Sequence, residues 1–279
     1  MNGLRELLLF YAEAGADEAL EEAPVDRFAD SRLAKAAPAP PQAQALQRPA
    51  PAMRHDPPTQ APSPPAAAPA VQASVPDDAQ AERARELARS AASLDELRDI
   101  LAGFDGCNLK FTAKNLVFAD GNPEADVMFV GEAPGRDEDL QGLPFVGRSG
   151  KLLDRMLAAI GLDRTTAYIA NVIPWRPPGN RTPTPLETEI CRPFIERQIE
   201  LAAPKVLVTL GGPSAKVLLN TQEGVLRLRG NWKVHRTAGG IDIPAMPTLH
   251  PAYLLRNPAH KRLAWRDFLV LKQKLRAVD

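Results

Sequence analysis

Residues 127–150 read VMFVGEAPGRDEDLQGLPFVGRSG, and this stretch carries the clearest information on both fold and ligand binding. The apolar run 127–130 has the composition of a buried strand, and it ends abruptly in the turn 131–135 (GEAPG). Such a turn exposes backbone N–H groups at the carboxyl edge of a sheet, where open α/β sheets bind ligands. The segment 144–147 (PFVG) adds an aromatic ring, which suits a flat ligand better than a core.

Composition and charge exclude several classes of protein. The chain has 279 residues, and its 34 basic residues balance its 34 acidic ones, so whole-chain charge does not indicate a polyanionic partner. Basic residues nevertheless accumulate after position 226, and acidic residues accumulate before position 23. Two cysteines give no disulfide framework and favour a reducing compartment. Because no apolar run approaches the ~20 residues of a membrane span, and no secretory signal is evident, we expect a cytoplasmic protein without membrane contact.

The sequence divides into three segments. We expect residues 1–30 to form an N-terminal amphipathic helix or peptide, whose apolar face would dock on a protein partner or on its own domain, unless it is a frayed end. Residues 31–80 are rich in Pro and Ala, with twelve prolines between positions 36 and 76, and predict a disordered linker because they cannot bury enough apolar surface. Residues 81–279 carry the folded domain.

Strand and helix patterns alternate in the folded domain, which predicts an α/β fold with a parallel sheet covered on both faces. The pattern of residues 226–235 favours a hairpin or an edge strand. We expect strands at 127–130, 167–172, 205–210 and 243–249, and helices at 78–101, 150–160, 184–201, 213–219 and 259–277.

Each expected strand is followed by polar or constrained residues. The ends of parallel strands meet at one rim of a sheet, so Glu132, Phe145, Asn171 and His250 should converge on a single pocket. A lone Asn or His at a strand end usually has a structural role, whereas several such groups together indicate a site.

Four motifs carry a resemblance to a known family: GEAPG (131–135), PFVGRSG (144–150), Asn171 followed by RPPGNRTPTP (176–185), and HPAYLLR (250–256). The chain resembles the family 4, iron–sulfur type of uracil-DNA glycosylase from about Asp105 to Lys274. The resemblance implies a three-layer α/β/α sandwich with a central four-stranded, mainly parallel sheet. It also implies a monofunctional enzyme that flips uracil out of DNA and hydrolyses the N-glycosidic bond, leaving an abasic site. Residues 81–279 would then be the catalytic domain.

The resemblance assigns roles in the pocket. Phe145 would stack on the flipped uracil, and Asn171 would bind its polar edge, because an amide offers a donor and an acceptor together. His250 would donate a hydrogen bond to O2 and stabilise the charge that develops there.

The turn after the first strand offers backbone contacts to the substrate and one candidate catalytic side chain. Gly131 and Ala133 would bind the base and its sugar through their backbones. Better-known uracil glycosylases hold the attacking water with an aspartate, and Ala133 stands at the equivalent place. Glu132 is therefore a candidate catalytic residue, with a role in the turn or in DNA positioning as its alternative.

DNA contacts are expected on both sides of the pocket, since a duplex must be opened before its base is reached. Ser149 would bind a phosphate, and Arg256 would bind a flanking one. Pro251, Tyr253 and Leu254 would contact DNA in a loop whose apolar side chains fill the vacated stack.

This sequence differs from the family at the residues that bind the family's cofactor. The family binds a [4Fe–4S] cluster through four cysteines, and Phe104 and Trp175 replace two of these ligands here. Cys107 and Cys191 remain, and two thiolates cannot complete a set of four. We therefore expect no metal and no other cofactor.

The expected partner is uracil-containing DNA, single- or double-stranded, bound by a monomer. One alternative is a catalytically weakened module of the same fold that recognises DNA damage. A nucleotide or phosphate hydrolase is another, although the chain lacks the GxxxxGK[ST] pattern.

Overall fold

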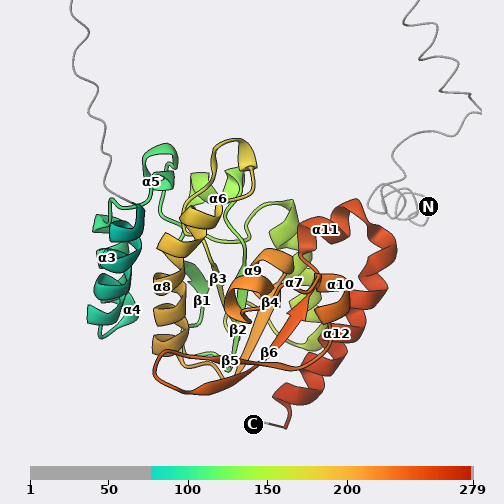
Figure 1. The fold of residues 1–279 in the computed structure, drawn as a ribbon. Coiled ribbons are helices and arrows are strands. Elements are labelled where there is room, and N and C mark those ends of the chain that lie inside the picture. Colours follow the sequence, from blue (N-terminus) through green and yellow to red (C-terminus); the bar gives the residue numbers. More distant parts are fainter. Residues whose placement is uncertain (1–76, 278–279) are drawn as a thin grey trace, which may run out of the picture. The chain divides into compact units, whose positions relative to one another are not determined.

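The computed structural model describes residues 77–277, so the expected helix at 1–30 and most of the expected linker lie outside the described residues. One sheet of six strands, in the order β1-β3-β2-β4-β6-β5, forms the centre of this region (Figure 1). The strands are β1 (Ala119–Gly121), β2 (Val127–Gly131), β3 (Tyr168–Asn171), β4 (Val206–Leu210), β5 (Lys233–Arg236) and β6 (Asp242–Thr248).

The sheet has two strands more than the four expected. Its inner strands β3, β2, β4 and β6 are parallel, whereas β1 pairs antiparallel with β3 and β5 pairs antiparallel with β6. The short edge strand β1 has the sequence ADG and is only half-buried, so no apolar run marks it. The segment 226–235 begins with most of the short helix α10 (Val225–Leu228) and then enters β5 at the edge of the sheet, so the edge-strand alternative is confirmed for its last part.

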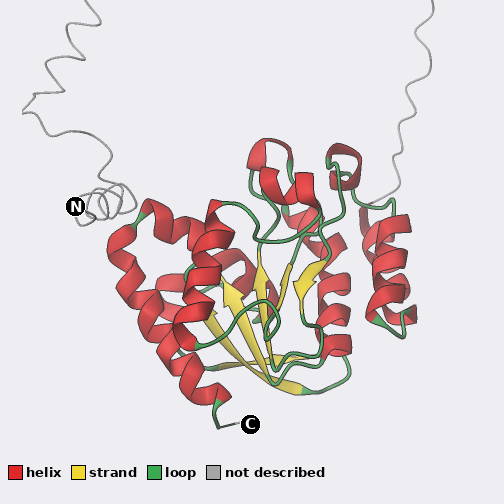
Figure 2. Ribbon diagram, turned by 180° about the vertical axis from the view of Figure 1, so that it is seen from behind, coloured by secondary structure: helices red, strands yellow, loops and turns green. Residues whose placement is uncertain are grey.

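Helices cover both faces of the sheet, which gives the domain three layers (Figure 2). Along β2, Met128 and Val130 belong to one apolar core, and Val127 and Phe129 belong to the other, as the two-residue period of a strand requires. The first core includes side chains of α3 (Asp77–Ser90), α4 (Leu94–Gly103) and α8 (Pro185–Ala202). The second includes side chains of α7 (Arg148–Ile160) and α12 (Lys261–Leu275). The remaining helices are α5 (Leu109–Thr112), α6 (Arg136–Gln141), α9 (Gly212–Leu218) and α11 (Pro251–Arg256), with 3₁₀ turns at Pro178–Asn180 and Pro258–His260.

Capping residues set two of the helix boundaries. The expected helix at 78–101 is in fact two helices, because the Ser93 side chain accepts a hydrogen bond from the Glu96 N–H and begins α4. At the start of α8, Thr184 and Glu187 form the reciprocal bonds of a capping box, with N–H to oxygen distances of 3.2 and 2.7 Å. Among residues 77–277, no helix is long and apolar enough to cross a bilayer.

Candidate active site

The strand ends meet at a cavity of about 500 Å³. Its lining comes mainly from the segments that follow β2, β3, β4 and β6. The segment after β3 is the long loop that leads to α8. The structure brings Glu132, Phe145, Asn171 and His250 to this one cavity, as expected from parallel strand ends, and Ala133 lines it as well. The parallel inner strands explain this convergence, because they place four chain turns at the same edge.

An aromatic wall forms one side of the cavity. The rings of Phe145 and His250 have their centroids 5.4 Å apart and their planes inclined by 31°. Phe145 is only 4% exposed and has a φ of +55°, a conformation that a bulky residue seldom adopts. The ring is therefore held in a defined place beside the imidazole, and its backbone is strained to keep it there.

Asn171, the last residue of β3, supplies an unused acceptor. Its side chain lines the cavity and is 5% exposed, and its Oδ1 atom has no hydrogen-bond partner among the described residues. Buried carbonyl oxygens are normally bonded, so this atom leaves an acceptor available to a ligand donor in the cavity.

Gly131 lies directly opposite Asn171 in the sheet and makes room for it. A Cβ at Gly131 would lie 2.4 Å from Asn171 Oδ1 and 2.6 Å from Phe145 Cζ. Gly131 is absent from the cavity lining itself, so its place in the site is to allow the close approach of the two side chains.

The imidazole of His250 is neutral at physiological pH, and its hydrogen bonding assigns the proton to Nε2. Burial, and then the charge of Arg256, lower the pKa of His250 to about 4. The Nδ1 atom caps α11 by accepting a hydrogen bond from the Ala252 N–H at 3.1 Å. The proton of the neutral imidazole must then reside on Nε2, which makes this atom a donor.

We expect the imidazole of His250 to stay neutral as the pH falls from 7 to about 5 and to protonate near pH 4. Since the folded-state pKa lies below the usual 6.5, the stability linked to this group is complete above pH 6.5 and is lost as the pH falls through 4. Nitrogen-detected NMR titration of the histidine side chains measures this directly. A midpoint near 6.5 would contradict the assigned tautomer and environment.

Two carboxylates line the cavity, and only one of them follows β2 directly. Burial raises the pKa of Glu132, whose backbone carbonyl accepts a hydrogen bond from the Ile173 N–H at 2.9 Å. The other, Glu138, was not singled out from the sequence, where it lies in a charged run. Its oxygens accept hydrogen bonds from the N–H groups of Gly135, Val146 and Gly147. Its position in the sequence, three residues after the Gly135 cap of α6, is the one from which a Glu side chain reaches back to the N–H of the cap residue.

The expected DNA-contacting loop at 251–256 is the helix α11. Ser149, Tyr253 and Arg256 line the cavity, with Tyr253 and Arg256 one helical turn apart. Pro251 is buried below them. Leu254 is 1% exposed and belongs to an apolar cluster with residues of other elements, so its side chain is not open to DNA in this structure. The helical period explains the difference, because it turns Leu254 away from the face that Tyr253 and Arg256 share.

The loop between β3 and α8 supplies cavity residues whose roles the sequence did not reveal. Pro177, Asn180, Arg181, Thr182 and Pro183 all line the cavity. The Arg181 guanidinium binds both oxygens of the Glu187 carboxylate, at 2.6 and 2.8 Å. This pair ties the loop to the first turn of α8.

The residues at the family's cluster positions do not fit a [4Fe–4S] cluster. Phe104, Cys107, Trp175 and Cys191 all belong to one buried apolar core, and the two Sγ atoms are 3.8 Å apart. The hydrogen bond between the two thiols raises the pKa of Cys191, which burial raises further, and lowers the pKa of Cys107. Phe104 and Trp175 offer iron no ligand atom, so only two of the four positions could bind it. Within the described part of the chain, no group of three His, Cys, Asp or Glu side chains could hold a metal.

Replacing Trp175 by Ala should lower the free energy of unfolding by ~3–5 kcal/mol, because Trp175 is 2% exposed and a large cavity would remain. Chemical denaturation followed by circular dichroism measures the change. Trp265 is 45% exposed, so Trp265→Ala is the matched control and should change stability by less than about 0.5 kcal/mol. A small effect at Trp175 would mean that this residue does not support the core.

The fold and cavity together define a class of protein: an α/β domain with a cavity at the carboxyl ends of its parallel strands, lined by an aromatic ring, a buried amide and an imidazole. The sequence matches the uracil DNA glycosylase superfamily over residues 118–269, and the chain belongs to this superfamily. It is 42% identical over 181 residues to the type-4 uracil-DNA glycosylase of Archaeoglobus fulgidus, covering 63% of this chain and 90% of the relative. It is 38% identical to the type-4 uracil-DNA glycosylase of Sulfurisphaera tokodaii, covering 65% of this chain and 84% of the relative.

Proposed function

We propose that this chain is a monofunctional uracil-DNA glycosylase, which flips uracil out of DNA and hydrolyses its N-glycosidic bond to leave an abasic site. The observation that carries the proposal is the buried, unpaired Oδ1 of Asn171 in one cavity with the Phe145 ring and a neutral His250. Membership of the superfamily and the type-4 relatives support the same activity.

Asn171 and Phe145 recognise the base. The Asn171 Oδ1 atom accepts the N3–H of uracil, and the amide nitrogen donates to O4. Cytosine offers an acceptor at N3 and donors at the neighbouring amino group, so both contacts would be mismatched. The face of Phe145 stacks on the ring and fixes its plane, which selects a planar base that has left the helical stack.

His250 assists the departure of the base. As the bond between C1′ and N1 breaks, negative charge develops on uracil O2, and the Nε2–H of His250 donates a hydrogen bond to it. A neutral donor serves this purpose over the whole physiological pH range, because the pKa of His250 is about 4.

Glu132 holds the attacking water in this proposal. Ala133 has no polar side chain, and the oxygens of Glu138 are engaged by three backbone N–H groups, so Glu132 is the carboxylate best able to orient a water at C1′. The water supplies the hydroxyl group of the abasic sugar, and its proton passes to the carboxylate.

Residues around the cavity bind the DNA strand. Ser149 lies in the first turn of α7, where unpaired N–H groups and the helix dipole favour a phosphate. Arg256 contributes a positive charge on the other side, and Tyr253 lies beside it on α11. Pro251 and Leu254 support this helix from the core instead of touching DNA.

The enzyme needs no metal in this proposal, because aromatic packing around Phe104 and Trp175 occupies the core that contains Cys107 and Cys191. We further propose that it acts as a monomer in the cytoplasm, and that residues 1–30 bind a protein partner. The DNA-binding alternative lacks a specific observation in its favour, because DNA binding alone needs neither the Asn171 amide nor the neutral His250.

A single-turnover assay tests this function. Purified protein in excess over a labelled oligonucleotide with one uracil should convert it to an alkali-labile product, in single-stranded or duplex DNA. The same oligonucleotides with cytosine in place of uracil are the matched controls and should remain resistant to alkali. Bound but uncleaved uracil DNA would instead support the DNA-binding alternative.

A further inference from the structure

The turn that carries Phe145 is held in a conformation that its own sequence does not favour. Phe145 has a φ of +55°, in the left-handed region, and it is neither Gly nor Asn. Such a backbone costs free energy and persists only where the surrounding structure imposes it. The turn also packs tightly on α7, since a Cβ at Gly150 would lie 1.6 Å from the Phe145 carbonyl oxygen.

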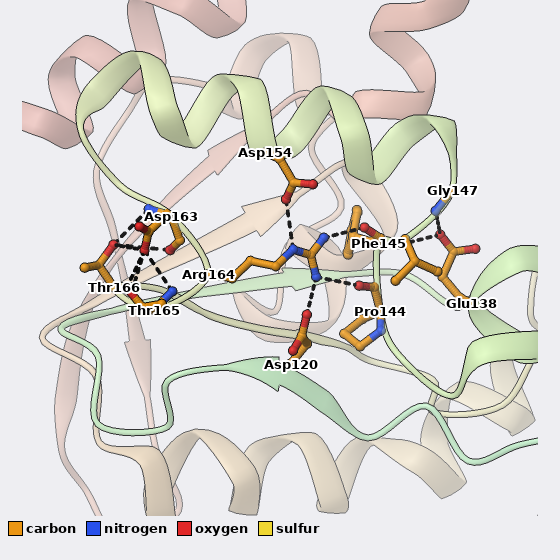
Figure 3. Close-up of polar contacts among 11 residues, drawn as sticks. Asp120, Glu138, Pro144, Phe145, Gly147, Asp154, Asp163, Arg164, Thr165 and Thr166 are labelled. Carbon is orange, nitrogen blue, oxygen red and sulfur yellow. Dashed lines mark hydrogen bonds and ion pairs between the residues drawn. The ribbon is translucent and has the colours of Figure 1, made fainter.

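Arg164 holds the first half of this turn. Its guanidinium donates to the carbonyl oxygen of Pro144 at 3.1 Å and to that of Phe145 (Figure 3). The same guanidinium is bound by Asp120 on β1 and by Asp154 on α7, the latter at 2.9 Å. Because two carboxylates fix the guanidinium, it presents its remaining N–H groups to the two carbonyls in a defined direction.

Glu138 holds the second half. Its Oε1 atom accepts hydrogen bonds from the N–H groups of Val146 at 3.1 Å and Gly147 at 3.0 Å. Its Oε2 atom accepts from Gly135, in the turn after β2, at 3.1 Å. Glu138 is only 7% exposed, so these bonds are largely shielded from water. One carboxylate thus joins the turn that bears the stacking ring to the turn that follows Glu132.

We propose that Arg164 and Glu138 are positioning residues of the uracil site, which together hold Phe145 in the orientation that stacks on the base. Arg164 binds the carbonyls at 144 and 145, and Glu138 binds the N–H groups at 146 and 147, so three consecutive peptide groups are fixed, the middle one at both its C=O and its N–H. Arg164 does not line the cavity, so its influence passes through Phe145. This inference rests on the proposed function for its effect on excision, and on the geometry alone for its effect on the turn.

A double-mutant cycle tests the effect on excision. Arg164→Met should lower kcat/KM for uracil excision at least tenfold, and less than about threefold when Phe145 is already Ala, because the ring it positions is absent. Arg164→Lys keeps the charge but cannot bridge both carbonyls, so it should reproduce most of the loss and serves if the Met variant does not fold. Equal losses in the presence and absence of the Phe145 ring would overturn the proposal.

Asp163 provides the matched control in the same loop. Its carboxylate accepts hydrogen bonds from the N–H groups of Thr165 and Thr166, and within the described part of the chain no hydrogen bond joins it to the turn at 144–147 (Figure 3). Asp163→Ala should lower the Tm while leaving kcat/KM unchanged at a temperature well below unfolding. A loss of activity equal to that of Arg164→Met would reduce the role of Arg164 to general support of its loop.

Amide hydrogen exchange tests the clamp without any catalysis. In the wild type the N–H groups of Val146 and Gly147 should be protected, and Glu138→Ala should speed their exchange at least tenfold while amides of β4 stay unaffected. Unchanged exchange would overturn the clamp even in an active enzyme. If Glu138→Ala speeds exchange but the wild-type protein releases no uracil, the proposed function is refuted and the clamp still stands.

Discussion

Replacing His250 by Ala is expected to slow single-turnover uracil excision about a hundredfold, the usual loss when one donor to a developing oxyanion is removed. The imidazole is neutral because its pKa is about 4, and the cap on Ala252 leaves Nε2 as its donor. This donor acts on a charge that exists only as the glycosidic bond breaks. Affinity for uracil-containing DNA, measured by fluorescence anisotropy, should therefore remain within about threefold of the wild-type value.

His260 supplies a control for the loss of an imidazole near the site. Its Nδ1 atom lies 2.7 Å from the Tyr253 hydroxyl, and it is absent from the cavity lining. His260→Ala should leave the single-turnover rate at saturating enzyme unchanged. An unaffected rate in His250→Ala, or equal losses in both variants, would remove His250 from the chemical step.

The second large effect is expected at Asn171. Asn171→Asp should lower uracil excision by about a hundredfold or more, because a carboxylate cannot donate to O4 and would bring a charge into a buried position. The single-turnover assay measures this loss on uracil and on cytosine substrates. Asn171 would have no role in base choice if the variant cut uracil at the wild-type rate and still left cytosine untouched.

Asn231 allows the same substitution away from the cavity. Its amide donates to the Arg227 carbonyl at 3.0 Å, in the loop before β5. Asn231→Asp should leave excision of uracil unchanged. A comparable loss there would point to a general effect of the added charge.

The inner sheet could be predicted from the sequence because its strands are buried on both faces. The runs at 127–130 and 206–210 are almost continuously apolar, and they lie at the centre of the sheet. The edge strand β1 could not be predicted, since its three residues are only half-buried, and β5, which buries only His235, could be predicted only as one of two alternatives. Short edge strands depend on their neighbour for stability more than on their own composition.

The site could be predicted where it depends on chain topology, and not where it depends on side-chain direction. Asn171 ends β3 and His250 lies just after β6, and these two strands are parallel, so their convergence was expected. A loop at 251–256 would leave Leu254 free to reach DNA, whereas the helix α11 turns this side chain into the core. The clamp by Arg164 could not be foreseen, because its contacts join residues 10 to 44 positions apart.

Identification of the released product tests the central claim most directly. A duplex with one uracil, incubated with excess protein, should yield free uracil by mass spectrometry in an amount equal to the abasic strand. The strand itself should stay intact until it is treated with alkali, as expected of a monofunctional glycosylase. Stable binding of the duplex with no free uracil, or cleavage of the strand without alkali, would contradict the account.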